Sequence, residues 1–289
     1  MKMKYLIGFG IVLILLTACS VSEKSETQRI ITVTIEPQRY FTEAIAGDKF
    51  TVISMVPKGN NPETYDPTPK QLMELGKSEA YFRIGYIGFE LSWMDRLISN
   101  VPHIRVSDTS KDIRFIQDTT HGSSFKNNME PHIWCSSVNA RIIARNTFDA
   151  LCDLDKENKH YYLSRYDSLC QRIELTDSII RGILEEKADR AFMIYHPTLS
   201  YYARDYGLCQ ICIEKDGKEP SPAHLKKLIE RCKLERVRTI FIQSEFDCHN
   251  AEAIAKETNT TLFPINPLSS NWEKEMIQVA EQLTKSVAH

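Results

Sequence analysis

The residues EPHIW at 130–134 place one histidine in a short loop of restricted conformation. Pro131 disfavours the helical conformation for the residue before it, so His132 is presented by an extended or turn-like segment. Ser136 and Ser137 follow directly, and their hydroxyls can cap the start of a helix. A histidine held in this way offers a ring nitrogen to a metal ion. The alternative is a loop imidazole that bonds only to the backbone.

A polar loop near the start of the chain occupies a position typical of ligand sites. The β-branched run Ile30–Ile35 predicts a buried strand, and Phe50–Val56 predicts a second one. Between them, Arg39–Ala46 predicts a short helix that ends at a glycine. Strand, helix and strand within about thirty residues indicate a βαβ unit and a parallel sheet. The Pro-, Gly- and Asn-rich loop at 57–69 leaves the second strand at its carboxyl end, where open α/β sheets bind ligands.

The rest of the chain continues this alternation. A hydrophobic fraction of 42% and a charged fraction of 26% predict a packed core, and 289 residues accommodate two domains. The expected strands are 80–84, 105–107, 191–195, 208–213, 239–242 and 262–268, and the expected helices are 70–77, 90–99, 138–151, 156–187 and 201–206.

Four motifs, in this order, resemble those of the cluster A-I solute-binding proteins, which serve zinc and manganese ABC transporters. The loop at 57–69 resembles their G-x-x-P-H-x-Y-E-P-T-P loop, and residues 130–134 resemble D-P-H-V-W. His196 and the helix after it resemble F-H-x-A-F-x-Y-F-A-x-x-Y-G, and residues 218–225 resemble the helix entry E-P-S-P-x-x-L. Residues 262–268 correspond to the last strand of the family, so the resemblance covers nearly the whole exported chain.

The resemblance implies four metal ligands, namely Glu63, His132, His196 and Asn266. Glu63 stands where the family has its first histidine, and a carboxylate oxygen suits Zn²⁺ as well as the harder Mn²⁺ or Fe²⁺. Asn266 stands where the family has an aspartate. Its neutral amide oxygen is a weaker donor, which either coordinates directly or holds a metal-bound water. We expect Zn²⁺ as the bound ion, with Mn²⁺ or Fe²⁺ as alternatives.

The expected fold is an α/β protein of two lobes, each a mostly parallel β-sheet flanked by helices. We expect an N-terminal lobe at 30–155, a linking helix at 156–187 and a C-terminal lobe at 188–289, with the metal in the cleft between the lobes. A helix of this length reaches roughly 45 Å, more than one small domain's width. In the resembled family such a helix is a stiff backbone, which implies limited tilting of the lobes on binding.

The first 18 residues resemble a lipoprotein signal peptide. Two lysines precede an uncharged apolar run that is shorter than the ~20 residues of a membrane span. The residues LTAC at 16–19 resemble a lipobox, which makes Cys19 the lipidated residue and 19–29 a tether. An uncleaved transmembrane anchor is the alternative. We therefore expect a lipid-anchored protein on the periplasmic or cell-surface face of a bacterial membrane.

These features predict a monomeric protein that captures a divalent metal ion for the permease of an ABC importer and catalyses no reaction. The formal net charge of -2 gives no electrostatic support for nucleic-acid binding. One alternative is a family member that has lost tight metal binding and acts in surface adhesion or interaction. Another is a zinc or iron metalloenzyme, because two histidines and one glutamate also describe catalytic sites. No further acid–base residue accompanies the loops.

The remaining cysteines and histidines carry less information. The chain has 8 cysteines, and seven remain when Cys19 is set aside. Sequence alone assigns no disulfide pairing among them. Cys209 and Cys212 point to opposite faces of a predicted strand, which disfavours a disulfide between them. Cys135 lies close to the first motif histidine and is a candidate stray ligand. His121 is the one histidine in the segment that replaces the histidine-rich loop of many zinc-specific relatives.

Overall fold

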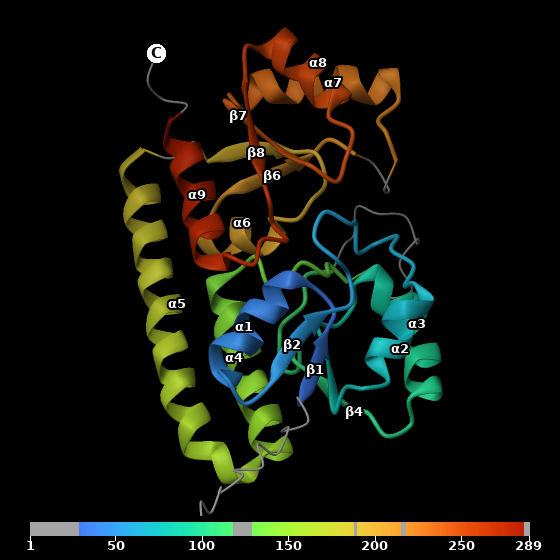
Figure 1. Cartoon of the computed structure of the whole chain (residues 1–289). Coiled ribbons are helices and arrows are strands. Elements are labelled where there is room, and N and C mark those ends of the chain that lie inside the picture. Colours follow the sequence, from blue (N-terminus) through green and yellow to red (C-terminus); the bar gives the residue numbers. More distant parts are fainter. Residues whose placement is uncertain (1–28, 118–128, 188–189, 215–217, 286–289) are drawn as a thin grey trace, which may run out of the picture.

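The computed structural model describes residues 29–117, 129–187, 190–214 and 218–285, which form two α/β lobes beside one long helix (Figure 1). The fold class predicted from the sequence is confirmed. Residues 1–28, with the predicted signal peptide and Cys19, lie outside the described residues, as does His121. Among the helices that are described, none combines the length and the apolar character needed to cross a membrane.

The N-terminal lobe is built on four parallel strands in the order β2-β1-β3-β4. The first strand lies inside the sheet, and Ile31 and Val33 are fully buried, as their β-branched run predicts. The strands are β1 (Ile30–Val33), β2 (Thr51–Ser54), β3 (Ala80–Arg83) and β4 (Arg105–Asp108), and the helices are α1 (Glu36–Ala46), α2 (Pro69–Leu75), α3 (Gly88–Asn100) and α4 (Ser137–Leu154).

Helix α1 begins three residues earlier than the sequence pattern predicts. The prediction placed its start at Arg39, but the helix begins at Glu36 and carries Pro37 in its first turn. Proline is tolerated there because the first N–H groups of a helix have no partner within the helix. The helix ends at Gly47, as predicted, with φ at 60°. Thr68 starts α2 with a capping box to Gln71.

The C-terminal lobe repeats the arrangement with four parallel strands in the order β6-β5-β7-β8. Because β5 and β7 are neighbours, the loops that leave their carboxyl ends lie next to each other. The strands are β5 (Ala191–Ile194), β6 (Cys209–Cys212), β7 (Thr239–Gln243) and β8 (Thr261–Ile265), and the helices are α6 (Ser200–Tyr206), α7 (Pro222–Leu234), α8 (His249–Thr258) and α9 (Trp272–Lys285).

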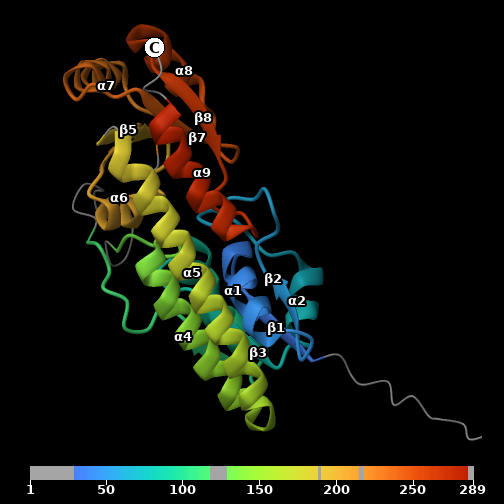
Figure 2. The ribbon, with the colours of Figure 1, turned by 90° about the vertical axis from the view of Figure 1, so that its left-hand side faces the viewer.

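Helix α5 (Lys159–Lys187) connects the lobes as a single element of 29 residues, after a short 3₁₀ turn at Lys156–Asn158. It packs against α1 and α4 of the N-terminal lobe and against α9 of the C-terminal lobe (Figure 2). Its buried side chains Tyr162, Leu169 and Ile173 follow the helical period. The exact residue boundaries of the two lobes and the tether stay predictions.

Two tryptophans, Trp134 and Trp272, join the lobes through hydrogen bonds of their indole N–H groups. The indole N–H of Trp134 donates to the carbonyl oxygen of Pro267 at 2.9 Å. The indole N–H of Trp272 donates to the carbonyl oxygen of Trp134 at 2.6 Å. Both rings are buried and belong to a hydrophobic core that contains residues of both lobes. The lobe interface is therefore packed like a protein interior and not like an open hinge.

Candidate metal centre

Glu63 is held at the cleft by the start of helix α3. Its Oε2 accepts the backbone N–H of Gly88 at 2.9 Å, whereas its Oε1 is buried and has no hydrogen-bond partner. A Cβ at Gly88 would lie 2.5 Å from the carbonyl oxygen of Glu63 and 2.7 Å from Oε2, so this close approach requires glycine. One oxygen is thus fixed while the other is left available to a cation.

His132 lies at the lobe interface with only 4% of its surface exposed. The constrained loop predicted from Pro131 delivers the ring, and the carboxylate of Glu130 bonds to Nδ1. The ring of Trp134 meets the imidazole edge-on, with the ring centroids 5.3 Å apart. These contacts fix the ring orientation and leave Nε2 facing the cleft.

His196 lies two residues after the end of β5, at the carboxyl end of that strand, as the sequence predicts. Its Nδ1 bonds to the carboxylate of Glu214 at 2.8 Å. The side chain of Gln243, at the end of β7, donates to the carbonyl oxygen of His196 at 2.7 Å. The ring of Phe246 stacks on the imidazole, with 4.7 Å between the centroids. The C-terminal lobe therefore orients His196 as firmly as the N-terminal lobe orients the other histidine.

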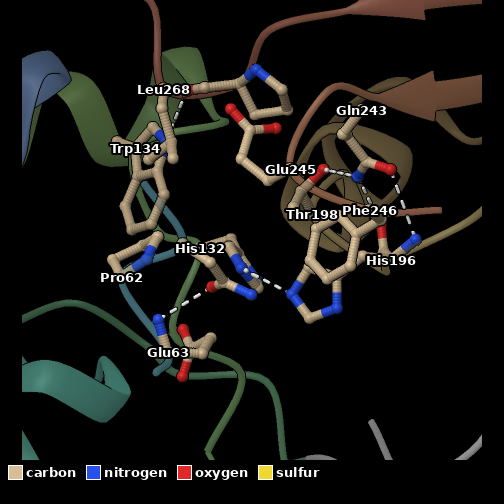
Figure 3. Close-up of a pocket in the computed structure, with 12 residues that line it drawn as sticks. Pro62, Glu63, His132, Trp134, His196, Thr198, Gln243, Glu245, Phe246 and Leu268 are labelled. Carbon is tan, nitrogen blue, oxygen red and sulfur yellow. Dashed lines mark hydrogen bonds between the residues drawn. The ribbon is translucent and has the colours of Figure 1, made fainter. Parts of the chain in front are cut away.

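The two imidazoles face each other across the cleft, with 3.3 Å between the Nε2 atoms of His132 and His196 (Figure 3). When both Nδ1 atoms donate to carboxylates, both Nε2 atoms carry lone pairs, which repel unless a cation lies between them. Two ligands of a tetrahedral zinc ion with bonds near 2.0–2.1 Å are about 3.3 Å apart. The pair thus has the spacing of two zinc ligands, and a single proton can take the ion's place.

The surrounding carboxylates set the charge of the pair. Burial by itself lowers the pKa of His132, but the Glu130 carboxylate outweighs it, so this pKa is raised. Burial likewise raises the pKa of Glu130, but the charge of His132 and its hydrogen bond outweigh that effect and lower it. Burial raises the pKa of Glu63, and the two histidines oppose this shift. The Glu130 carboxylate therefore favours positive charge on His132.

The cavity at this point has a volume of about 20 Å³. It is lined by Glu63 and both histidines, together with Asn61, Pro62, Trp134, Thr198, Gln243, Glu245, Phe246, Pro267 and Leu268. A single water needs about 10–15 Å³, so the cavity suits one ion and not an organic molecule. Among the described residues, no three His, Cys, Asp or Glu side chains are already arranged to hold an ion. For Glu63 to join the two imidazoles as a ligand, its carboxylate has to shift toward them.

The structure brings Glu63, His132 and His196 to one cavity and leaves Asn266 at the next one. Asn266 follows the last residue of β8, the buried Ile265, and its own side chain is exposed. Its Oδ1 accepts the backbone N–H of Leu268 at 3.1 Å. The assignment of Asn266 as a ligand stays a prediction, and it requires this side chain to leave its bond and turn.

Sequence reasoning missed Glu130 and Glu214, which orient the two imidazoles. Glu130 occupies the acidic position of the recognised motif, so its place in that motif was an available signal. Glu214 lies 18 residues from its histidine, and no local pattern indicated the contact. Burial raises the pKa of the Cys135 thiol well above its usual range, which keeps the thiol protonated and makes it a poor ligand. All seven described cysteines are free thiols, including Cys209 and Cys212.

A family model described as "Zinc-uptake complex component A periplasmic" matches residues 31–287. The chain is 25% identical over 284 residues to the iron ABC transporter substrate-binding lipoprotein MtsA of Streptococcus pyogenes, covering 91% of this chain and 88% of MtsA. A crystal structure of ZnuA is similar with a TM-score of 0.84 at 33% identity, covering 89% and 98% of the two chains. The Mn²⁺ complex of FpvC from Pseudomonas aeruginosa has a TM-score of 0.79 at 22% identity, covering 90% and 98%, and shows the fold alone.

Proposed function

Since this chain belongs to the family of periplasmic component A proteins of zinc-uptake complexes, we propose that it captures one divalent transition-metal ion and passes it to an importer. Glu63, His132 and His196 supply the donor atoms, two from the N-terminal lobe and one from the C-terminal lobe. The ion is bound reversibly and released unchanged. The volume of the cavity, about 20 Å³, supports capture of an ion over turnover of an organic substrate.

The single observation that carries this proposal is the pair of Nε2 atoms at 3.3 Å, each opposite a nitrogen that bonds to a carboxylate. The carboxylate–imidazole–metal arrangement recurs in protein metal sites because the carboxylate fixes the tautomer and makes the ligand nitrogen more basic. With both Nδ1–H groups donated to carboxylates, the two Nε2 acceptors face each other across one gap, and a cation in that gap satisfies both. The arrangement is therefore explained by a bound ion more simply than by packing.

We propose Zn²⁺ as the ion, with Mn²⁺ or Fe²⁺ as the alternatives. Two imidazoles favour zinc, whereas a carboxylate in place of a third nitrogen favours the harder ions. The names of the similar proteins mention zinc uptake for the family model, iron transport for MtsA and a complex with Mn²⁺ for FpvC, so similarity alone leaves the choice among these ions open. Metal analysis after purification without chelator, followed by competition between Zn²⁺ and Mn²⁺, decides among them.

Calorimetric titration of histidine variants tests the site. His132→Ala and His196→Ala should each weaken Zn²⁺ binding by about tenfold or more, because each removes a nitrogen ligand. His160→Ala is the matched control, since His160 is exposed on α5 and lies far along the sequence from both loops. Unchanged affinity in both site variants would contradict the assignment, and equal losses in all three variants would indicate a general effect of removing histidine.

We further propose that Cys19 is lipidated and that the anchored protein delivers its ion, as a monomer, to the permease of an ABC importer. The support is the lipobox-like LTAC at 16–19 together with the description of MtsA as a lipoprotein of an ABC transporter. Cys19→Ser should move the protein from the membrane fraction to the soluble fraction with unchanged metal affinity. A variant that remains wholly in the membrane fraction would indicate an uncleaved anchor.

A further inference from the structure

The proposed ion lacks one donor. Two imidazoles and one carboxylate provide three protein ligands, whereas a closed zinc site has four, and Mn²⁺ and Fe²⁺ accept more. Asn266 is committed to the N–H of Leu268 and lines the neighbouring cavity. The fourth donor has therefore to come from another residue that lines the cavity of the two histidines, or from water.

Glu245 is the one further carboxylate among the described residues that line this cavity. It is partly buried, and no described residue donates a hydrogen bond to its side chain. It lies on the loop between β7 and α8, two residues after Gln243, which holds the backbone of His196. The next residue, Phe246, stacks on the His196 ring, so contacts on either side of Glu245, from Gln243 and from Phe246, anchor this loop against the proposed ligand.

The direction of approach also suits a fourth ligand. Figure 3 shows Glu245 on the opposite side of the two imidazoles from Glu63. Tetrahedral coordination requires donors that surround the ion from different sides, and two carboxylates on the same side would repel each other. Turning the Glu245 carboxylate breaks no hydrogen bond from a described residue.

We infer that Glu245 swings onto the bound ion and completes its coordination, so that the site uses two imidazoles and two carboxylates. This inference rests on the proposed metal-capture function. Glu63 and Glu245 then carry two negative charges, which balance the charge of a divalent cation. A second carboxylate as the fourth donor suits harder ions better than a third nitrogen would, so Glu245 should contribute more to Mn²⁺ binding than to Zn²⁺ binding.

Two variants of the same loop provide the test, one at Glu245 and one at Asp247. Glu245→Gln should weaken Mn²⁺ binding by about tenfold or more and Zn²⁺ binding by a smaller factor. Asp247→Asn removes the same charge from the same loop at an exposed position that does not line the cavity, and it should change neither affinity by more than about twofold. Calorimetry with each metal alone gives the affinities, and Co²⁺ absorption of the loaded protein reports the donor set independently.

The outcomes separate this inference from the proposed function. If the wild-type protein binds Mn²⁺ or Zn²⁺ and Glu245→Gln binds with the same affinity and the same Co²⁺ spectrum, Glu245 is not a ligand. Loss of affinity in Asn266→Ala instead of Glu245→Gln would assign the fourth position to the amide. Equal losses in Glu245→Gln and Asp247→Asn would indicate a long-range charge effect. Absence of binding by the wild type would overturn the proposed function itself.

Discussion

At the scale of single residues, the pairing of His132 and His196 makes the protonation state of one imidazole decisive. The Glu130 carboxylate raises the pKa of His132, so in the metal-free protein His132 holds a proton more readily than an isolated histidine. A metal ion and this proton compete for the same gap between the two Nε2 atoms. Ion binding is therefore expected to release a proton.

This competition predicts how affinity depends on pH. Zn²⁺ affinity should fall as the pH is lowered through the raised pKa of His132, by about tenfold per pH unit if one proton is displaced. In the metal-free protein the same shift acts in the opposite direction. Because its folded-state pKa lies above the unfolded value, protonated His132 adds stability that is lost as the pH rises through the folded-state pKa.

Zinc titrations between about pH 8 and pH 5, in two buffers with different ionisation enthalpies, measure both the affinity and the number of protons released. Glu130→Gln serves as the comparison, because without that carboxylate the pKa of His132 falls and the loss of affinity moves to lower pH. Affinity that is constant over this range, with no proton released, would rule out competition at the imidazole pair.

At the scale of secondary-structure elements, the start of α3 supports the loop that carries Glu63. A side chain at Gly88 would collide with the backbone of Glu63, so Gly88→Ala must displace that loop. We expect Zn²⁺ affinity to fall by about tenfold, as is typical when a group that orients a ligand is disturbed. The site histidines, which come from other loops, should remain paired.

Gly182→Ala is the matched control for this change. Gly182 lies within α5, and a Cβ there meets nothing within 4 Å. Alanine should stabilise the helix by ~0.5–1 kcal/mol and leave metal affinity unchanged. Calorimetry and thermal unfolding of both variants make the comparison. Equal metal affinity in Gly88→Ala and the wild type would show that the position of the Glu63 loop does not matter for binding.

The helices and strands were largely predictable because the spacing of apolar residues along the sequence follows which side chains are buried. Ile30–Ile35 predicts β1, and the apolar positions of 156–187 predict α5, apart from its 3₁₀ start. The start of α1 was predicted three residues late, because Pro37 ends a strand and begins a helix equally well. A single residue does not define the boundary unambiguously where a helix follows a strand closely.

The candidate site was predictable only where its residues lie at the ends of predicted strands or in a recognised loop. Glu63, His132 and His196 line one cavity. Within each sheet, parallel strands place their carboxyl ends at one edge, where ligands bind. The carboxylate partner Glu214 depends on contact between two separate loops of one lobe. The exposure of Asn266 depends on how the chain leaves β8, and an edge strand of five residues without alternating burial does not indicate that.

At the scale of the whole molecule, the packed interface predicts that the two lobes move little when an ion binds. Helix α5 spans both lobes, and the hydrogen bonds of Trp134 and Trp272 cross the interface near the site. Separation of the lobes would break these hydrogen bonds and expose the buried tryptophan rings to water. Small-angle X-ray scattering should therefore give the same radius of gyration, within error, for the metal-free and the zinc-loaded protein.

A clear compaction on loading would contradict this expectation and indicate hinge closure. The variant Trp272→Phe makes the measurement sharper, because it keeps an aromatic ring but removes the N–H that bonds to the carbonyl oxygen of Trp134. That bond is worth about 0.5–1.5 kcal/mol, so the variant should unfold at lower denaturant concentration. If the bond restrains the lobes, the scattering of this variant should depend more strongly on metal than that of the wild type.

The most direct test of the central claim is the position of the ion itself. Crystals of the zinc-loaded protein, measured at wavelengths on either side of the zinc absorption edge, should show one anomalous peak at about 2.0–2.1 Å from Nε2 of His132 and from Nε2 of His196. The same peak should lie within bonding distance of Glu63. A peak at another place in the molecule, or no ordered peak in a protein that binds zinc in solution, would contradict the account.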